Sequence, residues 1–468
     1  MHSTANIAEA TNVPAGAARF ADVPEFAREL RFGDLPQDVV ACAQRCLLDL
    51  IGVAAAGSRT PAAAIANGFA TAQMCSRDGG ARMLFDGRLA SAAGAAFAGA
   101  TTIDAFDAHD GHLLTKGHVG VAVFPALLAY LDDAGLARGR IDGAEFITCL
   151  CLGYEIATRA GIVLHATAKD YHCSGAWTAI ACAAIGARLF GFDRDRMRHA
   201  LGIAEYFGPR GQILRVCAIP TMVKDGSGWG ALAGVSAALL ARENFTGSPA
   251  VTIEADDARS RWSDLGTRWR IREQYFKPYP VCHWAQQAIA AALALQHEHG
   301  FVADQVANVT IETFAEAVAL GSGCPLPRTT DEAQYSLPFP VAAALVFGRV
   351  GSDEVSAPAL TDPRIHRLLA TMTLVEDPTF SRRFPAERWA RVRVALNDGR
   401  TLVSAPAQAR GIPTNPMTDD ELRGKYRELA EPVLRQARST RIEEMIAALP
   451  TDPTALAVLT DEVLRPAD

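Results

Sequence analysis

The sequence predicts a mainly α protein in which a smaller α+β domain interrupts a large all-helical domain. Apolar residues recur at helical spacing up to about residue 265. Segments that alternate apolar and polar residues occur later, between about residues 269 and 405. A capping box that starts at Thr418 then signals a return to helix. With 468 residues the chain is too long for one simple core, so we expect two domains, 1–268 with 406–468 and 269–405.

The all-helical domain is predicted from apolar periodicity and from glycines and prolines at helix ends. Val39, Leu47 and Val53 belong to a long helix over 35–56 that ends at Gly57. The helices expected over 61–74 and 91–97 are rich in alanine and glycine, which lets helices approach closely. Further helices are expected over residues 25–30, 61–74, 91–97, 142–160, 175–190, 196–206 and 229–242.

The α+β domain is predicted from two alternating segments. The first covers 306–314, and the second covers 390–396 and continues through Asn397-Asp398-Gly399 into a third strand near Thr401. The Asn-Asp-Gly sequence is typical of a hairpin turn. Helices are expected between these strands, over 340–347 and 363–371.

Bulk composition limits the classes of function. The hydrophobic fraction of 49%, the charged fraction of 21% and the net charge of −7 are typical of a soluble protein and offer no broad attraction to nucleic acid or anionic lipid. Residues 1–20 lack the pattern of a signal peptide, and no apolar run spans a membrane without interruption, so we expect a cytoplasmic protein. The 10 cysteines lie mostly in apolar helical segments, which favours reduced core thiols.

Proton-transfer groups are densest between residues 104 and 120, which makes this stretch the active-site candidate. It lies between two segments that we expect to be buried, where unpaired charge is costly. Histidine beside aspartate is suited to general acid–base catalysis. A solvated polar loop is the plain alternative, and a metal site is a second one, although the ligand spacing matches no standard pattern. The groups are Asp104, Asp107, His109, Asp110, His112, Lys116 and His118, of which His109, Asp110, His112 and His118 would form the metal site.

Two helix starts add further candidates. His172 comes directly before the apolar helix at 175, where it is either an anion-binding group or a helix cap. Lys224 lies in a glycine-rich segment that resembles a phosphate loop, but no predicted strand precedes it, so a dinucleotide fold is improbable. The glycines favour close helix packing, and Lys224 is either a carboxylate-binding group or a surface lysine.

The segment from 276 to 283 lies at the predicted domain boundary. Its two prolines hold the backbone rigid and give Lys277 and His283 fixed directions, which is useful at a cleft. A plain interdomain linker is the alternative. Cys282 is a conceivable nucleophile, although nothing in the sequence indicates a lowered thiol pKa.

Together these motifs resemble the MmgE/PrpD family, which includes 2-methylcitrate dehydratase, cis-aconitate decarboxylase and iminodisuccinate epimerase. The resemblance covers nearly the whole chain, and the order of the motifs is specific. One departure is Gly111, which stands where several members of the family carry threonine. The motifs are Asp-x-x-Asp-Gly-His followed by His-x-Gly, Tyr-His-Cys-Ser-Gly, the Lys224 segment, Lys-Pro-Tyr-Pro-x-Cys and Ala-Gln-Tyr-Ser-Leu-Pro-Phe.

The resemblance implies a helical domain built from both ends of the chain, an inserted α+β lid domain, a homodimer, and no cofactor or metal. It also implies a small di- or tricarboxylate substrate. His118 or His172 would exchange protons, Asp107 would orient an imidazole, and the two lysines would bind carboxylates. The resemblance implies Asp107, His118, His172 and Lys224 as catalytic residues and Lys277 as a substrate-binding residue. We also expect His112, His283 and Tyr335 to bind substrate, although His112 and His283 depart from the family pattern.

The expected reaction is removal of a proton α to a carboxylate, most simply in a dehydratase. Four other reactions or roles stay open. A decarboxylase of the cis-aconitate type or an epimerase with His118 and His172 as opposed bases would pass through a similar stabilised carbanion. A metal-dependent enzyme would lose activity to a chelator, and a helical binding scaffold would have no activity to lose.

Overall fold

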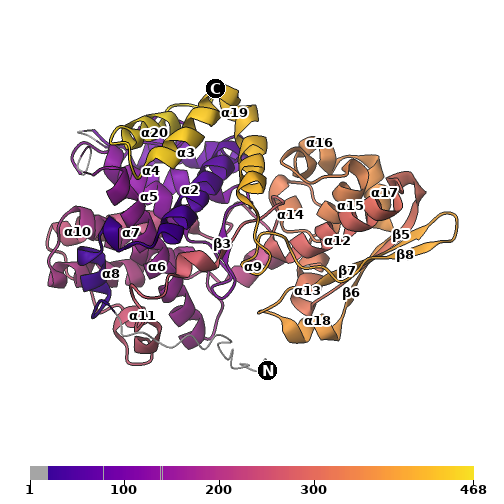
Figure 1. The fold of residues 1–468 in the computed structure, drawn as a ribbon, viewed down its shortest axis with the longest axis horizontal. Coiled ribbons are helices and arrows are strands. Elements are labelled where there is room, and N and C mark those ends of the chain that lie inside the picture. The colour runs from indigo at the N-terminus through magenta and orange to yellow at the C-terminus, as the bar shows by residue number, and fades with distance from the viewer. Residues whose placement is uncertain (1–18, 77–78, 137–138, 140) are drawn as a thin grey trace.

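The structure is a computed structural model that describes residues 19–76, 79–136, 139 and 141–468. Residues 1–18, which carry most of the segment used for the signal-peptide prediction, lie outside the described residues. The described chain is mostly helical, in agreement with the predicted fold class. Figure 1 shows two parts side by side, which we name the helical body (α1–α11 with α19 and α20) and the sheet unit (α12–α18 with β5–β8).

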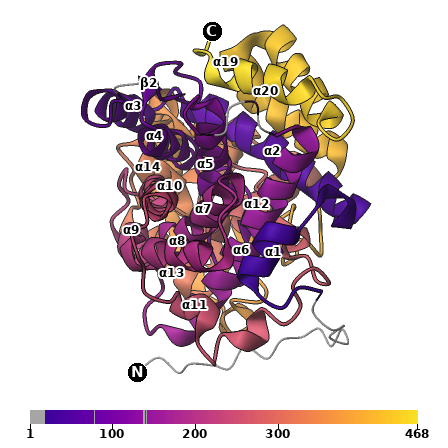
Figure 2. The same ribbon diagram turned by 90° about the vertical axis from the view of Figure 1, so that its left-hand side faces the viewer.

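The helical body is organised around α7, which is buried along nearly its whole length. Figure 2 shows α7 in the middle of the body, where it packs against α6, α8 and α10. Small residues allow this packing: a Cβ added at Gly230 of α10 would lie 2.6 Å from the Cα of Gly175 at the start of α7. The glycine-rich segment therefore serves close helix packing, as predicted. The helices are α1 (Val23–Glu29), α2 (Gln37–Gly57), α3 (Pro61–Gln73), α4 (Ala92–Asp104), α5 (Gly120–Asp132), α6 (Gly143–Thr167), α7 (Gly175–Leu189), α8 (Arg194–Phe207), α9 (Ile213–Ala218), α10 (Ser227–Arg242) and α11 (Val251–Glu254).

The sheet unit contains a four-stranded sheet in the order β6-β5-β7-β8. The hairpin of β7 (Ala390–Leu396) and β8 (Thr401–Val403) is confirmed, and β7 pairs antiparallel with β5 (Val306–Thr313). The sequence did not predict β6 (Met372–Glu376), which joins the other side of β5 in parallel. The helices of this unit are α12 (His283–His299), α13 (Ala315–Gly323), α14 (Thr330–Gln334), α15 (Pro338–Phe347), α16 (Ala357–Leu360), α17 (Pro363–Ala370) and α18 (Pro378–Arg383).

The C-terminal helices return to the helical body. The predicted capping box is present, since the Thr418 side chain accepts from the Glu421 amide and Glu421 accepts from the Thr418 amide at the start of α19 (Asp419–Ala448). α19 packs along α2, and α20 (Ala455–Leu464) follows it. The buried Lys425 ammonium of α19 donates to Asp49 of α2 at 2.5 Å and to the Ala108 carbonyl at 2.6 Å. Through Lys425, helix α19 thereby holds the backbone of the polar stretch at Ala108 in place.

Short strands in the helical body depart from the sequence prediction, which found no strand pair before about residue 265. β1 (Ala81–Arg82) pairs with β2 (Leu89–Ala90), and β3 (Gly111–His112) pairs with β4 (Gln274–Tyr275). A strand of two residues leaves no readable alternation in a sequence, which is why these pairs were missed. The exact domain boundaries and the lid role of the sheet unit stay predictions.

Two of the described helices, α2 and α6, are long and apolar enough to cross a membrane. All of the apolar window of α6 and 67% of that of α2 are buried inside the protein. Buried core helices of globular proteins have the same length and composition, so these two helices are weak evidence for a membrane span.

Candidate active site

A cavity of about 40 Å³ lies where the polar stretch meets the first residues of the sheet unit. The polar stretch forms a loop between α4 and α5, which we name the site loop (residues 105–119). Residues from distant parts of the chain come together here. The lining residues are Asp107, Lys116, His118, Tyr171, Ile213, Cys217, Asp225, Tyr275, Lys277, Cys282, His283, Trp284, Tyr335 and Arg388.

Asp107 and Lys277 form a buried ion pair in the cavity wall. Burial alone would raise the pKa of Asp107, but the Lys277 ammonium holds it well below its usual range. Burial alone would lower the pKa of Lys277, and Asp107 outweighs this effect, so the pKa of the ammonium is raised. Both groups are therefore charged at neutral pH.

Lys224 is joined to Asp107 through Gln334 rather than lying in the cavity lining. The Gln334 side-chain oxygen accepts from the Lys224 ammonium at 2.8 Å and from the Asp107 amide at 2.7 Å. The ammonium also lies 3.2 Å from a carboxylate oxygen of Asp331 and 5.2 Å from the ring centre of Tyr335. Lys224 is thus buried and paired, and the alternative of a surface lysine is wrong.

His118 presents an unprotonated ring nitrogen beside Asp225. Its Nδ1 donates to the Asp110 carbonyl at 2.6 Å, which fixes the tautomer and leaves the lone pair on Nε2. Nε2 lies 3.7 Å from Asp225 Oδ2. Burial, together with the charges of His109 and Lys277, lowers the pKa of His118 to about 4. The imidazole is therefore neutral at neutral pH and can accept a proton.

Asp225 is held by Ser174, the residue directly before α7. The Ser174 hydroxyl donates to Asp225 Oδ2 at 2.7 Å and accepts from the His118 amide at 2.9 Å. Burial raises the pKa of Asp225 to about 6, although His118 acts in the opposite direction. At a mildly acidic pH the carboxyl group therefore keeps its proton while the neighbouring imidazole is neutral. The pKa of this aspartate is thus higher than that of the histidine, whereas the pKa of a free aspartate is lower.

Behind His118, the site loop carries further buried polar groups. His109 packs edge-on against His118 with ring centres 4.3 Å apart, and burial lowers its pKa to about 3. Asp110 accepts from the Tyr154 hydroxyl at 2.9 Å, and burial raises its pKa to about 7. These groups are fully buried, so the alternative of a solvated polar loop is wrong.

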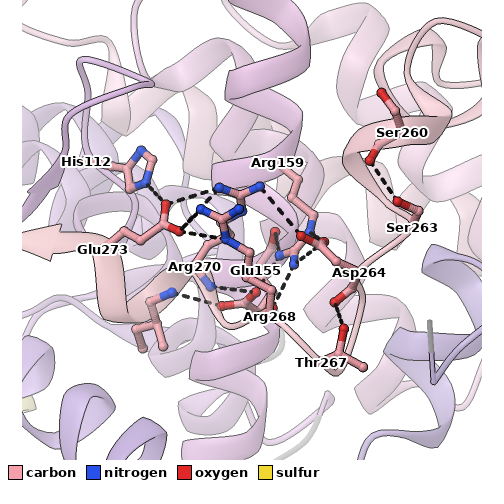
Figure 3. Close-up of polar contacts among 11 residues, drawn as sticks. His112, Glu155, Arg159, Ser260, Ser263, Asp264, Thr267, Arg268, Arg270 and Glu273 are labelled. Carbon is pink, nitrogen blue, oxygen red and sulfur yellow. Dashed lines mark hydrogen bonds and ion pairs between the residues drawn. The ribbon is translucent and has the colours of Figure 1, made fainter. Parts of the chain in front are cut away.

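His112 lies in a separate charged network. Its Nε2 is 2.9 Å from Glu273, which also contacts Arg268 and Arg270 (Figure 3). The network continues through Asp264 to the buried Arg159 of α6. His112 is absent from the cavity lining, and its pairing indicates that it anchors the site loop rather than binding substrate.

His172 also lies outside the cavity lining. Its Nδ1 is 3.4 Å from the Arg210 carbonyl, and its backbone pairs with Gln212. The adjacent residue Tyr171 faces the cavity instead. The structure therefore does not assemble His118 and His172 as an opposed pair in this cavity.

The remaining predicted residues lie in the cavity wall. His283 Nδ1 accepts from Arg388 at 2.7 Å, and its ring centre is 4.2 Å from that of Tyr275. Tyr335 lines the cavity beside Lys224. Burial raises the pKa of Cys282 to about 11, so this cysteine is a neutral thiol and a poor nucleophile. All 10 cysteines are free, as predicted.

Gly111 is required where the site loop passes under the cavity. An added Cβ would lie 2.5 Å from the Tyr275 hydroxyl oxygen and 2.8 Å from His118 Nδ1. Neither contact can be accommodated without moving a cavity residue. The glycine at position 111, where several family members carry threonine, thus leaves the room that the Tyr275 hydroxyl occupies.

Within the described residues, no cluster of three or more histidine, cysteine, aspartate or glutamate side chains is arranged to hold a metal ion. In particular, His112 turns to Glu273, whereas His118 lines the cavity and His109 packs behind it. The four residues of the predicted metal alternative thus do not converge on one point.

Some residues of the site were not singled out by sequence reasoning. Asp225, which lines the cavity, and Gln334, which joins Lys224 to Asp107, lie inside the quoted motifs, so their spacing could have indicated them. Arg388 gave no such signal, because it lies among other arginines just before β7. Only the fold shows which of these arginines faces a cavity.

Comparison with known proteins places the chain among enzymes. The model of the MmgE/PrpD N-terminal domain matches residues 21–270, and that of the C-terminal domain matches residues 279–451. A cis-aconitate decarboxylase-like protein of Aspergillus oryzae is 26% identical over 95% of this chain and 97% of its own length. A cis-aconitate decarboxylase of Aspergillus terreus is 23% identical over 94% of this chain and 95% of its own. A 2-methylcitrate dehydratase of Cupriavidus necator is 27% identical over 48% of this chain and 50% of its own.

Proposed function

Because the chain belongs to the MmgE/PrpD family, we propose that it is a cofactor-independent lyase of the dehydratase type that acts on a small di- or tricarboxylate. The observation that carries the proposal is His118, a neutral imidazole with a free Nε2 in a cavity that also holds buried cations. A neutral base beside positive charge is suited to removing a proton α to a carboxylate, since the cations stabilise the enolate-like negative charge that develops.

The proposed reaction uses three groups of the cavity. His118 Nε2 takes the proton from the carbon, and the electron pair of that C–H bond forms the C=C bond while hydroxide leaves from the adjacent carbon. Asp225 lies 3.7 Å from Nε2 and stabilises the imidazolium that forms. Lys277, held by Asp107, faces the growing negative charge. The leaving hydroxide takes the proton from the His118 imidazolium and departs as water, which returns His118 to its neutral form.

The test is incubation with citrate, 2-methylcitrate, cis-aconitate and iminodisuccinate in deuterated water, followed by NMR. We expect one of these acids to give a product and to incorporate deuterium at the carbon that exchanges its proton. His118→Gln should lower kcat about 100-fold or more, because the base is lost. His172→Gln is the matched control and should stay near wild type. Absence of turnover and of exchange with every acid, in a folded protein, would contradict the proposal.

A second candidate is a decarboxylase of the cis-aconitate type. The cis-aconitate decarboxylase of Aspergillus terreus and the decarboxylase-like protein of Aspergillus oryzae align over nearly the whole chain, whereas the dehydratase of Cupriavidus necator aligns over 48% of it. The same NMR experiment separates the two reactions. Loss of a carboxylate carbon as carbon dioxide supports decarboxylation, and loss of the hydroxyl group with all carboxylates retained supports dehydration.

We also propose that the protein is a cytoplasmic homodimer. Large apolar side chains are exposed near one another in sequence around α8–α10, with exposed fractions of 76% for Tyr206, 73% for Ile219, 68% for Val223 and 53% for Trp229. Exposed apolar side chains of this size favour a protein partner. Light scattering on the purified protein measures the oligomeric state, and a monomer at micromolar concentration would contradict the proposal.

A further inference from the structure

The cations of the site differ in whether a carboxylate already neutralises them. Lys277 is paired with Asp107, and Lys224 is paired with Asp331. Arg388 has no carboxylate within ion-pair distance among the described residues, although it is 4% exposed and lines the cavity. Burying a guanidinium without a counter-ion costs folding free energy unless an anion from outside the protein pairs with it.

Arg388 offers one complete hydrogen-bonding edge. Its Nη1 donates to His283 Nδ1 at 2.7 Å, whereas Nε and Nη2 are buried with no hydrogen-bond partner in the described chain. Nε–H and Nη2–H point in parallel from the same side of the guanidinium plane, which is the fork that binds both oxygens of a carboxylate. The unused edge thus matches a carboxylate in shape as well as in charge.

The surroundings hold this edge in place. His283 accepts the Nη1 hydrogen bond, and burial together with Arg388 lowers the pKa of His283 well below its usual range, so it stays a neutral acceptor. The Arg388 guanidinium also lies 5.9 Å from the ring centre of Phe384. Lys116 is a second cation of the lining, and its ammonium lies 4.5 Å above the Tyr171 ring with no carboxylate partner among the described residues.

We propose that Arg388, held by His283 and assisted by Lys116, binds a second carboxylate of the substrate, separate from the one beside the carbon that loses its proton. This inference rests on the proposed function and deepens it. Arg388 comes from the sheet unit, two residues before β7, whereas His118 and Lys116 come from the site loop of the helical body. The enzyme would therefore select substrates with at least two carboxylates and disfavour monocarboxylates.

The experiment is calorimetric titration with tricarballylate, a tricarboxylate without a hydroxyl group or double bond to react. The proteins are wild type, Arg388→Gln, Arg388→Lys, Lys116→Met and Arg393→Gln. Arg393 is the matched control, because it lies five residues further along the same segment and pairs with Glu312 away from the cavity. Thermal unfolding without ligand is measured for each variant to detect a structural effect.

We expect Arg388→Gln to weaken tricarballylate binding about 10-fold to 100-fold, as loss of charge-assisted hydrogen bonds predicts. Arg388→Lys should recover part of the affinity, Lys116→Met should lose a smaller part, and Arg393→Gln should match wild type. Without ligand, Arg388→Gln should unfold at the wild-type temperature or above, because it removes an unpaired buried charge.

Two results would overturn the inference. Unchanged tricarballylate affinity in Arg388→Gln, with binding intact in wild type, would refute the second carboxylate site and leave the proposed function standing. An equal loss of affinity and of unfolding temperature in both Arg388→Gln and Arg388→Lys would assign Arg388 a structural role. If wild type binds neither tricarballylate nor any acid of the NMR test at millimolar concentration, the proposed function itself fails, and the inference with it.

Discussion

At the scale of single residues, the site depends on two neighbouring groups whose pKa values are shifted in opposite directions. Burial lowers the pKa of His118 to about 4 and raises that of Asp225 to about 6. Pairs of groups shifted apart in this way are typical of sites that exchange protons. Neutral His118 can take a proton, and ionised Asp225 then stabilises the imidazolium.

This pair predicts a specific pH dependence. Below about pH 6 Asp225 is protonated and no longer stabilises imidazolium, so kcat/KM of the wild type should fall as the pH decreases through 6. Asp225→Asn should be slower at pH 7.5 and should lack this limb, with a decline only near pH 4 as His118 itself becomes protonated. The measurement is a pH–rate profile of both proteins with one substrate, so that titration of the substrate affects both alike. The same limb at pH 6 in both proteins would contradict the assignment.

Several residues of the cavity could be predicted from the sequence. Asp107, His118 and Lys277 were predicted because each lies in a dense or rigid polar motif, and the structure brings all three to one cavity. The direction of a side chain is decided by tertiary packing, which a local pattern does not contain. The resemblance implied His172 as a catalytic residue, although Tyr171 is the neighbour that lines the cavity.

At the scale of elements, the strand pair of β3 and β4 ties the site loop to the segment that carries Lys277. Glu273, next to β4, is the charged centre of this connection, since it contacts His112, Arg268 and Arg270 (Figure 3). Burial alone would raise the pKa of Glu273, but His112 and the arginines hold it well below its usual value. The ionised carboxylate therefore stabilises the folded state.

Glu273→Gln should lower the free energy of unfolding by about 2 kcal/mol at pH 7, because it removes several charge-assisted hydrogen bonds. A carboxyl group with a lowered pKa in the folded state stabilises above its unfolded pKa of about 4.5, and this contribution is lost as the pH falls. The difference between wild type and variant should thus shrink below about pH 4.

The measurement for Glu273 is urea denaturation at pH 7 and at pH 3.5. Glu298→Gln is the control, because Glu298 is exposed at the end of α12 and its one ion pair with a described residue is to His299 at 4.0 Å. A loss of stability in Glu273→Gln that is the same at both pH values would contradict an electrostatic role.

Most elements followed from the sequence, and those that did not share a physical reason. α2, α7 and the β7–β8 hairpin have strong periodicity or turn signals and were predicted close to their observed bounds. β3 and β4 pair with each other although they lie far apart in the sequence, with Gly111 opposite Tyr275. Their own few residues therefore carry no local signal for a strand. α6 continues to Thr167, beyond the predicted end at 160, since tertiary packing extends a buried helix past its own sequence signal.

At the scale of the whole molecule, the cavity is small and is built from both parts of the protein, the helical body and the sheet unit. Its volume of about 40 Å³ is far below the roughly 300 Å³ or more of typical ligand pockets. The wall combines the site loop of the helical body with Arg388 and His283 of the sheet unit. Entry of a tricarboxylate thus requires that side chains or the two parts move apart, which fits the lid role predicted for the sheet unit.

The central claim is that this one cavity binds a polycarboxylate between His118 and Arg388. The most direct measurement is a crystal structure of the wild-type protein with tricarballylate. We predict one carboxylate on the Nε and Nη2 edge of Arg388, a second near Lys277, and a carbon of the ligand facing His118 Nε2. A ligand bound elsewhere, or a cavity without tricarballylate at a concentration that saturates binding in solution, would contradict the account.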